Sequence, residues 1–303
     1  MAKRVVVEGE AGRTKWCEEL EAGNILFFPK TPFDFPQDQI DFLLQQRQGG
    51  SKARKNIAYK PQADKITNHD ASDPKSAERL KEILRNYSQS ASAFLGKILE
   101  PYAKAWKLDY ASFRPFQEKG RKLRVRARND LLHVDAFPTR PLHGARILRF
   151  FTNINPTEGR HWITAQPFAE LAKMFGGEGG VKFPERGGLE MKAKEWLKAM
   201  GLKVALRSPY DTFMLKMHHF LKENEEFQNN CPKDSWVFPP HSCWAVFTDQ
   251  VSHAALAGQY ALEQTFLVPV SAMVHPEKAP VQVLEKLASR SMVEDKYLSN
   301  LFK

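Results

Sequence analysis

The segment Leu131-Leu132-His133-Val134-Asp135 carries the pattern that decides the fold. Its histidine and aspartate stand two positions apart, so on an extended backbone both side chains leave the same face and can meet one metal ion. The pair alone is a weak signal, because a chain with 9 histidines and 35 acidic residues produces such a spacing by chance. Its meaning depends on the sequence around it.

A lone histidine, His253, lies far downstream in a context that fits a third ligand. Residues 244–248 form an apolar run typical of a strand, residues 249–252 form a polar turn, and a second strand-like run follows the histidine. Two histidines and one carboxylate from different strands leave positions on Fe(II) open for a co-substrate and O₂. We therefore predict that His133, Asp135 and His253 hold iron.

Other histidines could supply the third ligand instead, namely His143, His161, His218, His219 and His241. The pair His218-His219 falls in a helical pattern, and His241 follows two prolines, so neither has the strand-turn-strand context of His253. Taken singly, His133 or His253 could equally be a structural histidine. The combination of both with Asp135 favours the metal site.

Elsewhere the chain alternates between helical and strand-like patterns. Helices are expected at 13–20, 36–46, 73–99, 168–175, 190–200 and 211–225. Strands are expected at 4–8, 25–28, 123–128, 147–154, 236–238, 242–248 and 260–270, and residues 51–60 resemble a basic loop. A strand-rich half with a helical insertion, preceded by a helical N-terminal third, is typical of a β-sandwich or barrel with added helices.

Within residues 123–128, apolar side chains alternate with Arg124, Arg126 and Arg128, which predicts a strand with one basic face. An unbroken strand would direct these arginines away from the metal ligands, whereas a turn at Asn129-Asp130 could reverse their direction. Two interpretations stay open: contact with an anionic substrate, or a basic face in solvent.

Over most of its length the chain resembles the 2-oxoglutarate-dependent oxygenases, and among them the 3-deoxy-D-manno-oct-2-ulosonic acid (Kdo) 3-hydroxylase family. The resembling segments are residues 20–29, 55–59, 132–137, 148–156 and 247–266. The resemblance implies Fe(II), 2-oxoglutarate and O₂ as cofactor and co-substrates. It also implies oxidative decarboxylation to succinate and CO₂, with hydroxylation of the Kdo sugar of a lipid A precursor.

The same resemblance implies a mixed α and β fold with a double-stranded β-helix, or jelly-roll, core in a single domain spanning residues 1–303. The expected parts are an N-terminal helical and strand layer at 1–112, the core at 113–165 and 231–272, a helical insertion at 166–230, and a C-terminal helical tail at 273–303.

The residue that binds the distal carboxylate of 2-oxoglutarate is less clear from the sequence. Many relatives place an arginine about ten residues after the second histidine, but residues 254–266 contain no basic residue. A carboxylate in an apolar pocket needs a charged partner. Arg149, inside an apolar run, is the first candidate, with Asn153 assisting. Arg146 and Gln259 are the next candidates, and Arg149 could instead pair with a buried acid.

The charge balance favours an anionic partner. There are 45 basic and 35 acidic residues, a net charge of +10 and a pI of about 9.4. This excess suits an anionic substrate or membrane surface, although a basic surface in solvent explains it equally well. We expect a Kdo-lipid A type glycolipid as substrate and peripheral contact with an anionic membrane. No nucleic-acid partner is expected, and the oligomeric state is not defined.

The N-terminal residues lack the features of a signal peptide, and no apolar run is long enough to span a bilayer. Three widely spaced cysteines suit neither a disulfide framework nor zinc. The cytoplasm is therefore the expected compartment, and the resemblance to the Kdo 3-hydroxylases implies a place at the inner face of a Gram-negative inner membrane. Two alternatives remain: an oxygenase acting on a protein side chain or small metabolite, and a non-enzymatic jelly-roll that binds anionic glycan or nucleic acid.

Overall fold

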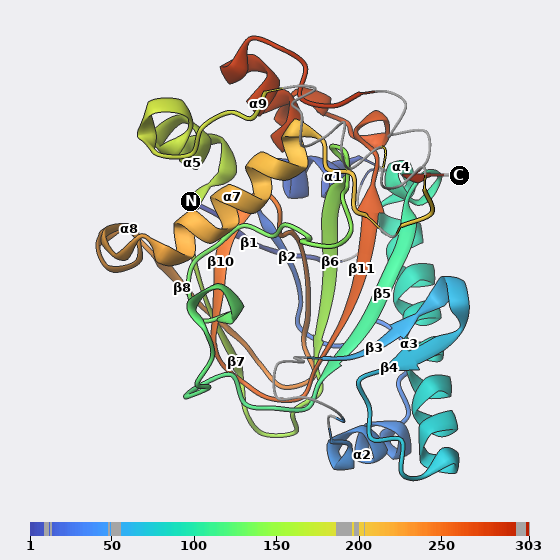
Figure 1. Ribbon diagram of the computed structural model, residues 1–303. Coiled ribbons are helices and arrows are strands. Elements are labelled where there is room, and N and C mark those ends of the chain that lie inside the picture. Colours follow the sequence, from blue (N-terminus) through green and yellow to red (C-terminus); the bar gives the residue numbers. More distant parts are fainter. Residues whose placement is uncertain are drawn as a thin grey trace.

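The computed structural model describes residues 1–8, 12, 14–47, 49, 56–185, 196, 200–202, 204–294 and 301–302, which form a mixed α and β fold around two sheets (Figure 1). The strands are β1 (Arg4–Val6), β2 (Ile25–Phe28), β3 (Ile57–Lys60), β4 (Lys65–Thr67), β5 (Lys107–Arg114), β6 (Arg146–Asn153), β7 (Arg160–Pro167), β8 (Asp234–Phe238), β9 (Cys243–Phe247), β10 (Val251–Ala257) and β11 (Ala261–Val268).

The larger sheet has eight strands in the order β1-β2-β9-β6-β11-β5-β3-β4, and the smaller has three in the order β10-β7-β8. From β6 onward the chain changes sheet repeatedly: β7 and β8 lie in the smaller sheet, β9 in the larger, β10 in the smaller and β11 in the larger. This alternation is the connectivity of a jelly-roll. The prediction of a mixed fold with a strand-rich core is confirmed.

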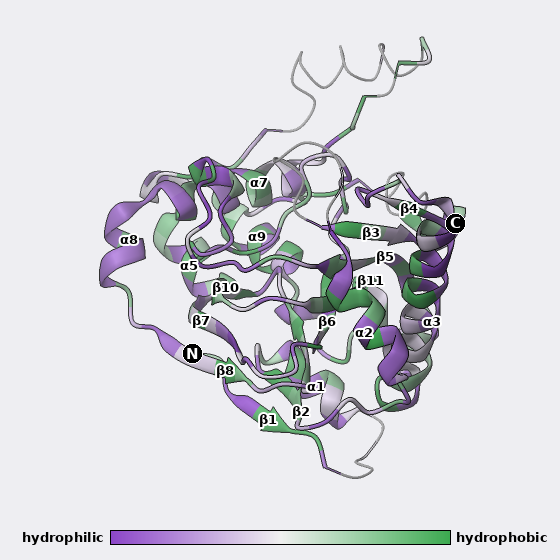
Figure 2. Cartoon of the chain, turned by 90° about the horizontal axis from the view of Figure 1, so that it is seen from below, coloured by the Kyte–Doolittle hydropathy of each residue, from purple (hydrophilic) through white to green (hydrophobic). Residues whose placement is uncertain are grey.

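Helices surround the sheets. They are α1 (Lys15–Glu21), α2 (Gln37–Gln45), α3 (Pro74–Ile98), α4 (Glu100–Ala103), α5 (Phe168–Phe175), α7 (Pro209–Glu223), α8 (Glu225–Asn230) and α9 (Pro280–Ala288). One face of α3 packs into the same apolar cluster as the larger sheet. Figure 2 shows the corresponding division of polarity, with β2 and β6 hydrophobic and α8 hydrophilic.

The two faces of β6 have different environments, because side chains alternate along a strand. Leu148 and Phe150 pack into the cluster that includes α3. Phe151 points the other way, into an aromatic cluster with Trp162 of β7 and Trp244 of β9. The space between the sheets is therefore lined by the odd-numbered residues of β6, which include Arg149.

The strongest helix signals are confirmed and have identifiable caps. Asp73 accepts a hydrogen bond from the Lys75 backbone N–H at 2.9 Å, and Pro74 occupies the first turn of α3. Ser208 and Asp211 form a reciprocal capping box at the start of α7. These caps fix where both helices begin, so the position of α7 against the core is well defined.

Several expectations about local structure are wrong or incomplete. Residues 123–128 form no strand: a 3-10 turn spans Val125–Ala127, and the alternating arginines have no partner strand. The basic loop expected at 51–60 ends in β3. Strands β4, β5, β7 and β10 were not expected. The helix expected at 190–200 lies mostly outside the described residues.

Among the described helices, none combines the length and the apolar composition needed to cross a membrane.

Candidate metal and co-substrate site

The two segments predicted to hold a metal lie side by side between the sheets. His133 and His253 form an isolated antiparallel bridge, in which each backbone N–H donates to the other's carbonyl, at 3.1 and 2.9 Å. The Asp135 backbone N–H also donates to Thr248 O at 2.8 Å. These bonds bring the two imidazole ring centres to 4.8 Å from each other. The structure thus brings together all three residues that the sequence singled out.

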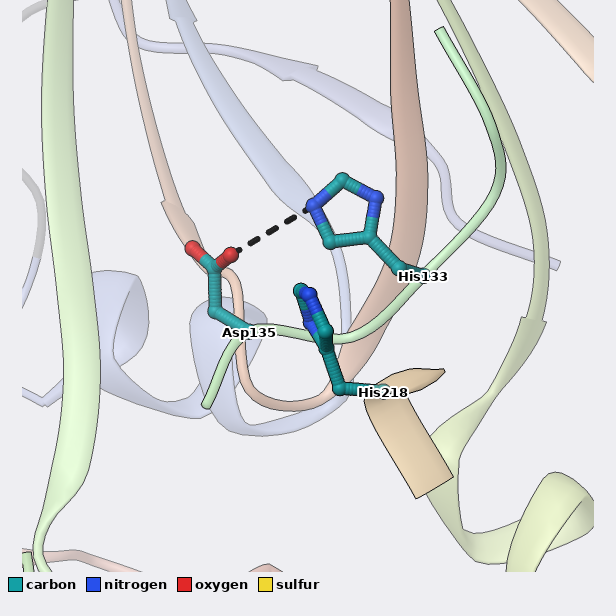
Figure 3. A group of neighbouring side chains, drawn as sticks. All are labelled: His133, Asp135 and His218. Atoms are coloured by element: carbon teal, nitrogen blue, oxygen red, sulfur yellow. Dashed lines mark ion pairs between the residues drawn. The ribbon is translucent and has the colours of Figure 1, made fainter. Parts of the chain in front are cut away.

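A third histidine, His218 of α7, joins this group (Figure 3). One ligand atom each from His133, Asp135 and His218 lie within 4.8 Å of one another. His133 Nε2 is 3.5 Å from Asp135 Oδ1, and the rings of His133 and His218 meet edge to face at 4.9 Å. The sequence offered His218 only as an alternative third ligand ranked behind His253, because a helical pattern does not reveal which element the helix packs against.

The three histidines share one hydrogen-bonding arrangement. The Nδ1 atom of His133 lies 2.7 Å from Leu131 O, that of His253 2.9 Å from Val251 O, and that of His218 2.7 Å from Val134 O. A carbonyl can only accept, so each Nδ1 carries the proton and each Nε2 has its lone pair available. This outer hydrogen bond is characteristic of metal-binding histidines.

The protonation states also suit a cation. Burial, with a smaller contribution from Lys222, lowers the pKa of His133 to about 3. Burial likewise lowers the pKa of His253 and, to a greater extent, that of His218. Burial opposes ionisation of Asp135, but the Arg149 guanidinium and neighbouring imidazoles outweigh it and hold the pKa of Asp135 well below its usual range. Neutral imidazoles beside a carboxylate form a donor set that fits Fe(II).

These side chains line a cavity of about 280 Å³. Trp162 forms part of its wall and stacks on the His253 ring, with centres 5.0 Å apart and an angle of 20°. Phe151 packs edge to face against Trp162. The aromatic wall fixes the His253 ring and limits the water around it. The basic residues that line the same cavity are Arg114, Arg126, Arg149, Arg160 and Lys222.

Arg149 lies beside the metal ligands, as its position on the inner face of β6 requires. Its Nε is 3.0 Å from Asp135 Oδ2, and it pairs with the buried Glu263 through Nη1. Both interpretations of Arg149 therefore describe part of what is found: it lines the cavity and it pairs with buried acids. It also borders a second, adjoining cavity of about 510 Å³.

Arg160 and Arg114 are functional candidates that the sequence did not indicate. Arg160 begins β7, is 1% exposed, and contacts Glu118 and the Gly258 carbonyl, both at 3.3 Å. Gly258 is required there, because it adopts φ +117° and a Cβ would stand 2.9 Å from Arg160 Cγ. Glu118 is shared with Arg114 and Arg121. Burial lowers the pKa of Arg160 to about 10, which reflects this incomplete neutralisation.

The remaining co-substrate candidates lie away from the cavity. Arg146 has the opposite strand parity to Arg149 and is fully buried in a two-pronged ion pair with Asp249, at 2.7 and 3.2 Å. The Asn153 amide donates to three backbone carbonyls, and the Gln259 amide donates to Pro115 O at 2.8 Å. None of the three lines the cavity. Their side chains stabilise the fold.

The arginines of residues 123–128 have separate environments. Arg126 lines the cavity and forms an ion pair with Glu223 of α7 at 2.6 Å, although its side chain is 60% exposed. Arg128 pairs with Asp130 at 2.7 Å. Arg124 is exposed. Because residues 123–128 form no strand, the expectation that alternation would direct all three arginines to one side does not apply. Of the three, only Arg126 borders the site.

Comparison with known proteins agrees with this geometry. The family model for 3-deoxy-D-manno-oct-2-ulosonic acid (Kdo) hydroxylase matches residues 5–291. The apo structure of the Kdo hydroxylase KdoO, a non-heme Fe(II) alphaketoglutarate dependent dioxygenase, is 34% identical, with a TM-score of 0.85 over 96% of this chain and 97% of that chain. Curated protein sequences gave no match.

Two further KdoO structures contain ligands. The complex with cobalt(II) is 34% identical, with a TM-score of 0.85 over 96% of this chain and 98% of that chain. The complex with alphaketoglutarate and Fe(III) is 34% identical, with a TM-score of 0.83 over 96% of this chain and 97% of that chain. With a family match over nearly its whole length and this structural agreement, the chain belongs to the Kdo hydroxylase family.

Proposed function

We propose that this chain is an Fe(II)- and 2-oxoglutarate-dependent dioxygenase that hydroxylates the Kdo sugar of a lipid A precursor. One observation carries the proposal: a buried carboxylate and imidazoles with available Nε2 atoms converge on one cavity, in a chain of the Kdo hydroxylase family. Bound Fe(II) would supply the redox chemistry by which O₂ converts 2-oxoglutarate to succinate and CO₂ and hydroxylates a C–H bond.

His133, Asp135 and His253 would hold the metal. His133 and His253 are fixed by their reciprocal backbone hydrogen bonds, and each ring is oriented by a carbonyl at its Nδ1. Asp135 is oriented by Arg149, which leaves Oδ1 toward His133. The backbone around all three residues is therefore held in place before a cation binds.

We propose Arg149 as the partner of the distal carboxylate of 2-oxoglutarate. When Asp135 shares its charge with a metal ion, the Arg149 guanidinium loses part of its neutralisation and can accept an incoming carboxylate. Arg160 is the rival, because Glu118 is divided among three guanidiniums. Substitution at each position separates them, since only the residue that holds the co-substrate should change the 2-oxoglutarate requirement strongly.

The adjoining 510 Å³ cavity is the proposed place for the sugar. Arg149 and Phe137 line both cavities, so a ligand in the larger one would lie against the arginine that contacts Asp135. Lys60 and Arg140 lie over the Tyr110 ring, at 5.2 and 4.1 Å from its centre, and polar side chains surround them. Basic groups above an aromatic ring suit a carboxylated sugar such as Kdo.

Membrane contact is proposed from the surface near this opening. Trp196, Met200 and Leu202 are more than half exposed, and Leu202 borders a hollow that also includes Pro138 and Arg207. Pro138 in turn lines the metal cavity. Apolar side chains close to basic ones suit the interface of an anionic membrane, where a glycolipid presents its sugar. We propose peripheral association with the membrane that carries the substrate.

Turnover on Kdo-lipid A tests the function directly. The protein should convert it only when Fe(II), 2-oxoglutarate and O₂ are all present, and should release one succinate for each hydroxylated sugar. A peptide and small sugar acids, each assayed separately, serve as alternative substrates. Efficient succinate release with one of these, and none with Kdo-lipid, would assign another substrate to the same chemistry.

A further inference from the structure

His218 faces the proposed metal site from a different element than the three predicted ligands. It lies on α7, whereas His133 and Asp135 lie in one extended segment and His253 on β10. Figure 3 shows its ring beside His133 and Asp135, joined to neither by a drawn interaction. Since the predicted facial triad is complete without it, its presence needs a separate explanation.

The geometry allows His218 to act as a metal donor as well as a packing residue. Its Nδ1 is 2.7 Å from Val134 O, so the ring is fixed by the backbone between the two ligands and its Nε2 lone pair is free. A first-row metal ion binds nitrogen or oxygen at about 2.1 Å, so two donors on one ion lie within roughly 4.2 Å. The donor atoms of His133, Asp135 and His218 already lie within 4.8 Å.

The helix that carries His218 is held in place independently of any metal. Its N-terminus has the Ser208–Asp211 capping box, and Asp211 also accepts from the backbone of Leu142 and His143 at 2.7 and 3.1 Å. Met217, beside His218 in sequence, is fully buried. A small movement of α7, rather than folding of a new segment, would bring Nε2 to the ion or withdraw it.

We propose that His218 binds the metal when no sugar is present and leaves it when the sugar binds. The inference rests on the proposed function. Of the three positions that the triad would leave open on the metal, 2-oxoglutarate would take two and O₂ would need the last. An imidazole in that last position would prevent O₂ from reacting before the sugar has arrived, which protects the enzyme from wasted turnover.

The same helix offers the coupling to substrate. Lys222 lies one turn after His218, on the same face, and both line the cavity. Lys222 also donates to Arg126 O at 3.3 Å, and Arg126 pairs with Glu223. An anionic sugar that contacts Lys222 or Arg126 would therefore act on the turn of α7 that positions His218.

The number of imidazoles bound to Co(II), measured by X-ray absorption, tests this proposal without turnover. The wild-type protein should show three imidazoles with Co(II) alone and two after addition of 2-oxoglutarate and Kdo. His218→Ala should show two throughout. His219→Ala is the matched control, because its half-buried ring is the next residue on the helix, and it should behave as wild type.

A second measurement covers the functional consequence. Succinate release in the absence of sugar should rise at least severalfold in His218→Ala and stay unchanged in His219→Ala. Two imidazoles in the wild type without sugar, or three that persist after the sugar binds, would overturn the proposal and leave the enzyme function intact. Failure of the wild type to bind Co(II) at all would instead contradict the metal site itself.

Discussion

His133 and His253 exchange two backbone hydrogen bonds, of 3.1 and 2.9 Å, although most of the jelly-roll separates them in sequence. This bridge links β10 to the segment that contains His133, which precedes β6 in the sequence. It extends the smaller sheet by one short pairing on the free side of β10. Because both rings leave adjacent extended backbones, their separation is set by the sheet and not by flexible side chains. The metal site is therefore as rigid as the core around it.

The first prediction concerns the ligands. His133→Ala, Asp135→Ala and His253→Ala should each abolish turnover and weaken Co(II) binding while the far-ultraviolet circular dichroism stays that of wild type, since an open site has few protein ligands to lose. His241→Ala is the control, because this residue lies outside the cavity lining. Full Co(II) binding by His253→Ala would exclude His253 as the third ligand.

The second prediction concerns the co-substrate. Arg149→Ala should raise the KM for 2-oxoglutarate steeply, because loss of a buried charge-assisted pair costs about 2–5 kcal/mol. Arg149→Lys should restore part of the affinity, since it keeps the charge and loses the two-pronged geometry. The same measurement on Arg160→Ala decides between the two. If Arg160→Ala raises the KM for 2-oxoglutarate more than Arg149→Ala does, and Arg149→Ala stays near wild type, then Arg160 binds the distal carboxylate.

The third prediction links acid stability to Glu263. Burial raises the pKa of Glu263, but the guanidiniums of Arg149 and Arg114 outweigh burial and the pKa lies below its ordinary value. A lowered pKa gives stability that is present above the unfolded value of about 4.3 and is lost as pH falls through the folded value. Glu263→Gln should therefore lower the free energy of unfolding by about 3–5 kcal/mol at pH 7.

The difference in free energy of unfolding between wild type and Glu263→Gln, measured with urea, should shrink as the pH falls from about 4. The wild-type carboxyl is then progressively protonated and comes to resemble the neutral glutamine. Glu226→Gln, at an exposed carboxyl of α8, is the control and should differ little from wild type at either pH. An equal loss of stability in Glu263→Gln at neutral and acidic pH would show that shape, and not charge, is responsible.

The fourth prediction concerns membrane contact. The fraction of protein bound to anionic vesicles should fall as salt rises from about 50 to about 500 mM, because screening shortens the range of attraction to a net charge of +10. Turnover on vesicle-borne Kdo-lipid should fall in parallel, whereas binding of 2-oxoglutarate should change little. Salt-independent binding to neutral vesicles would point instead to the apolar side chains around Trp196.

Much of the fold could be predicted from the sequence, because helix caps and apolar runs act on the residues next to them. The capped helix at Pro74–Ile98 and the apolar strand at Arg146–Asn153 both have short-range signals in the sequence. The strand expected at 123–128 failed, because alternation does not produce a strand when no neighbouring strand is available to pair with it.

The candidate site was only partly accessible to such patterns. His133, Asp135 and His253 were predicted as metal ligands because their spacing and the strand-like runs around them are local properties of the sequence. His218, Arg114 and Arg160 reach the same cavity from three other elements, and only tertiary packing brings them there. No periodicity in one sequence reports that a helical histidine faces a distant strand, so His218 was ranked behind His253, and the two arginines were not predicted at all.

The fate of isotopically labelled O₂ tests the central claim most directly. With Fe(II), 2-oxoglutarate and Kdo-lipid A, one labelled oxygen should appear in the Kdo sugar and the other in succinate, in equal amounts. His133→Ala should incorporate neither. Hydroxylated Kdo without the label, or labelled succinate formed while the sugar stays unmodified, would contradict the assignment of this chain as a Kdo hydroxylase.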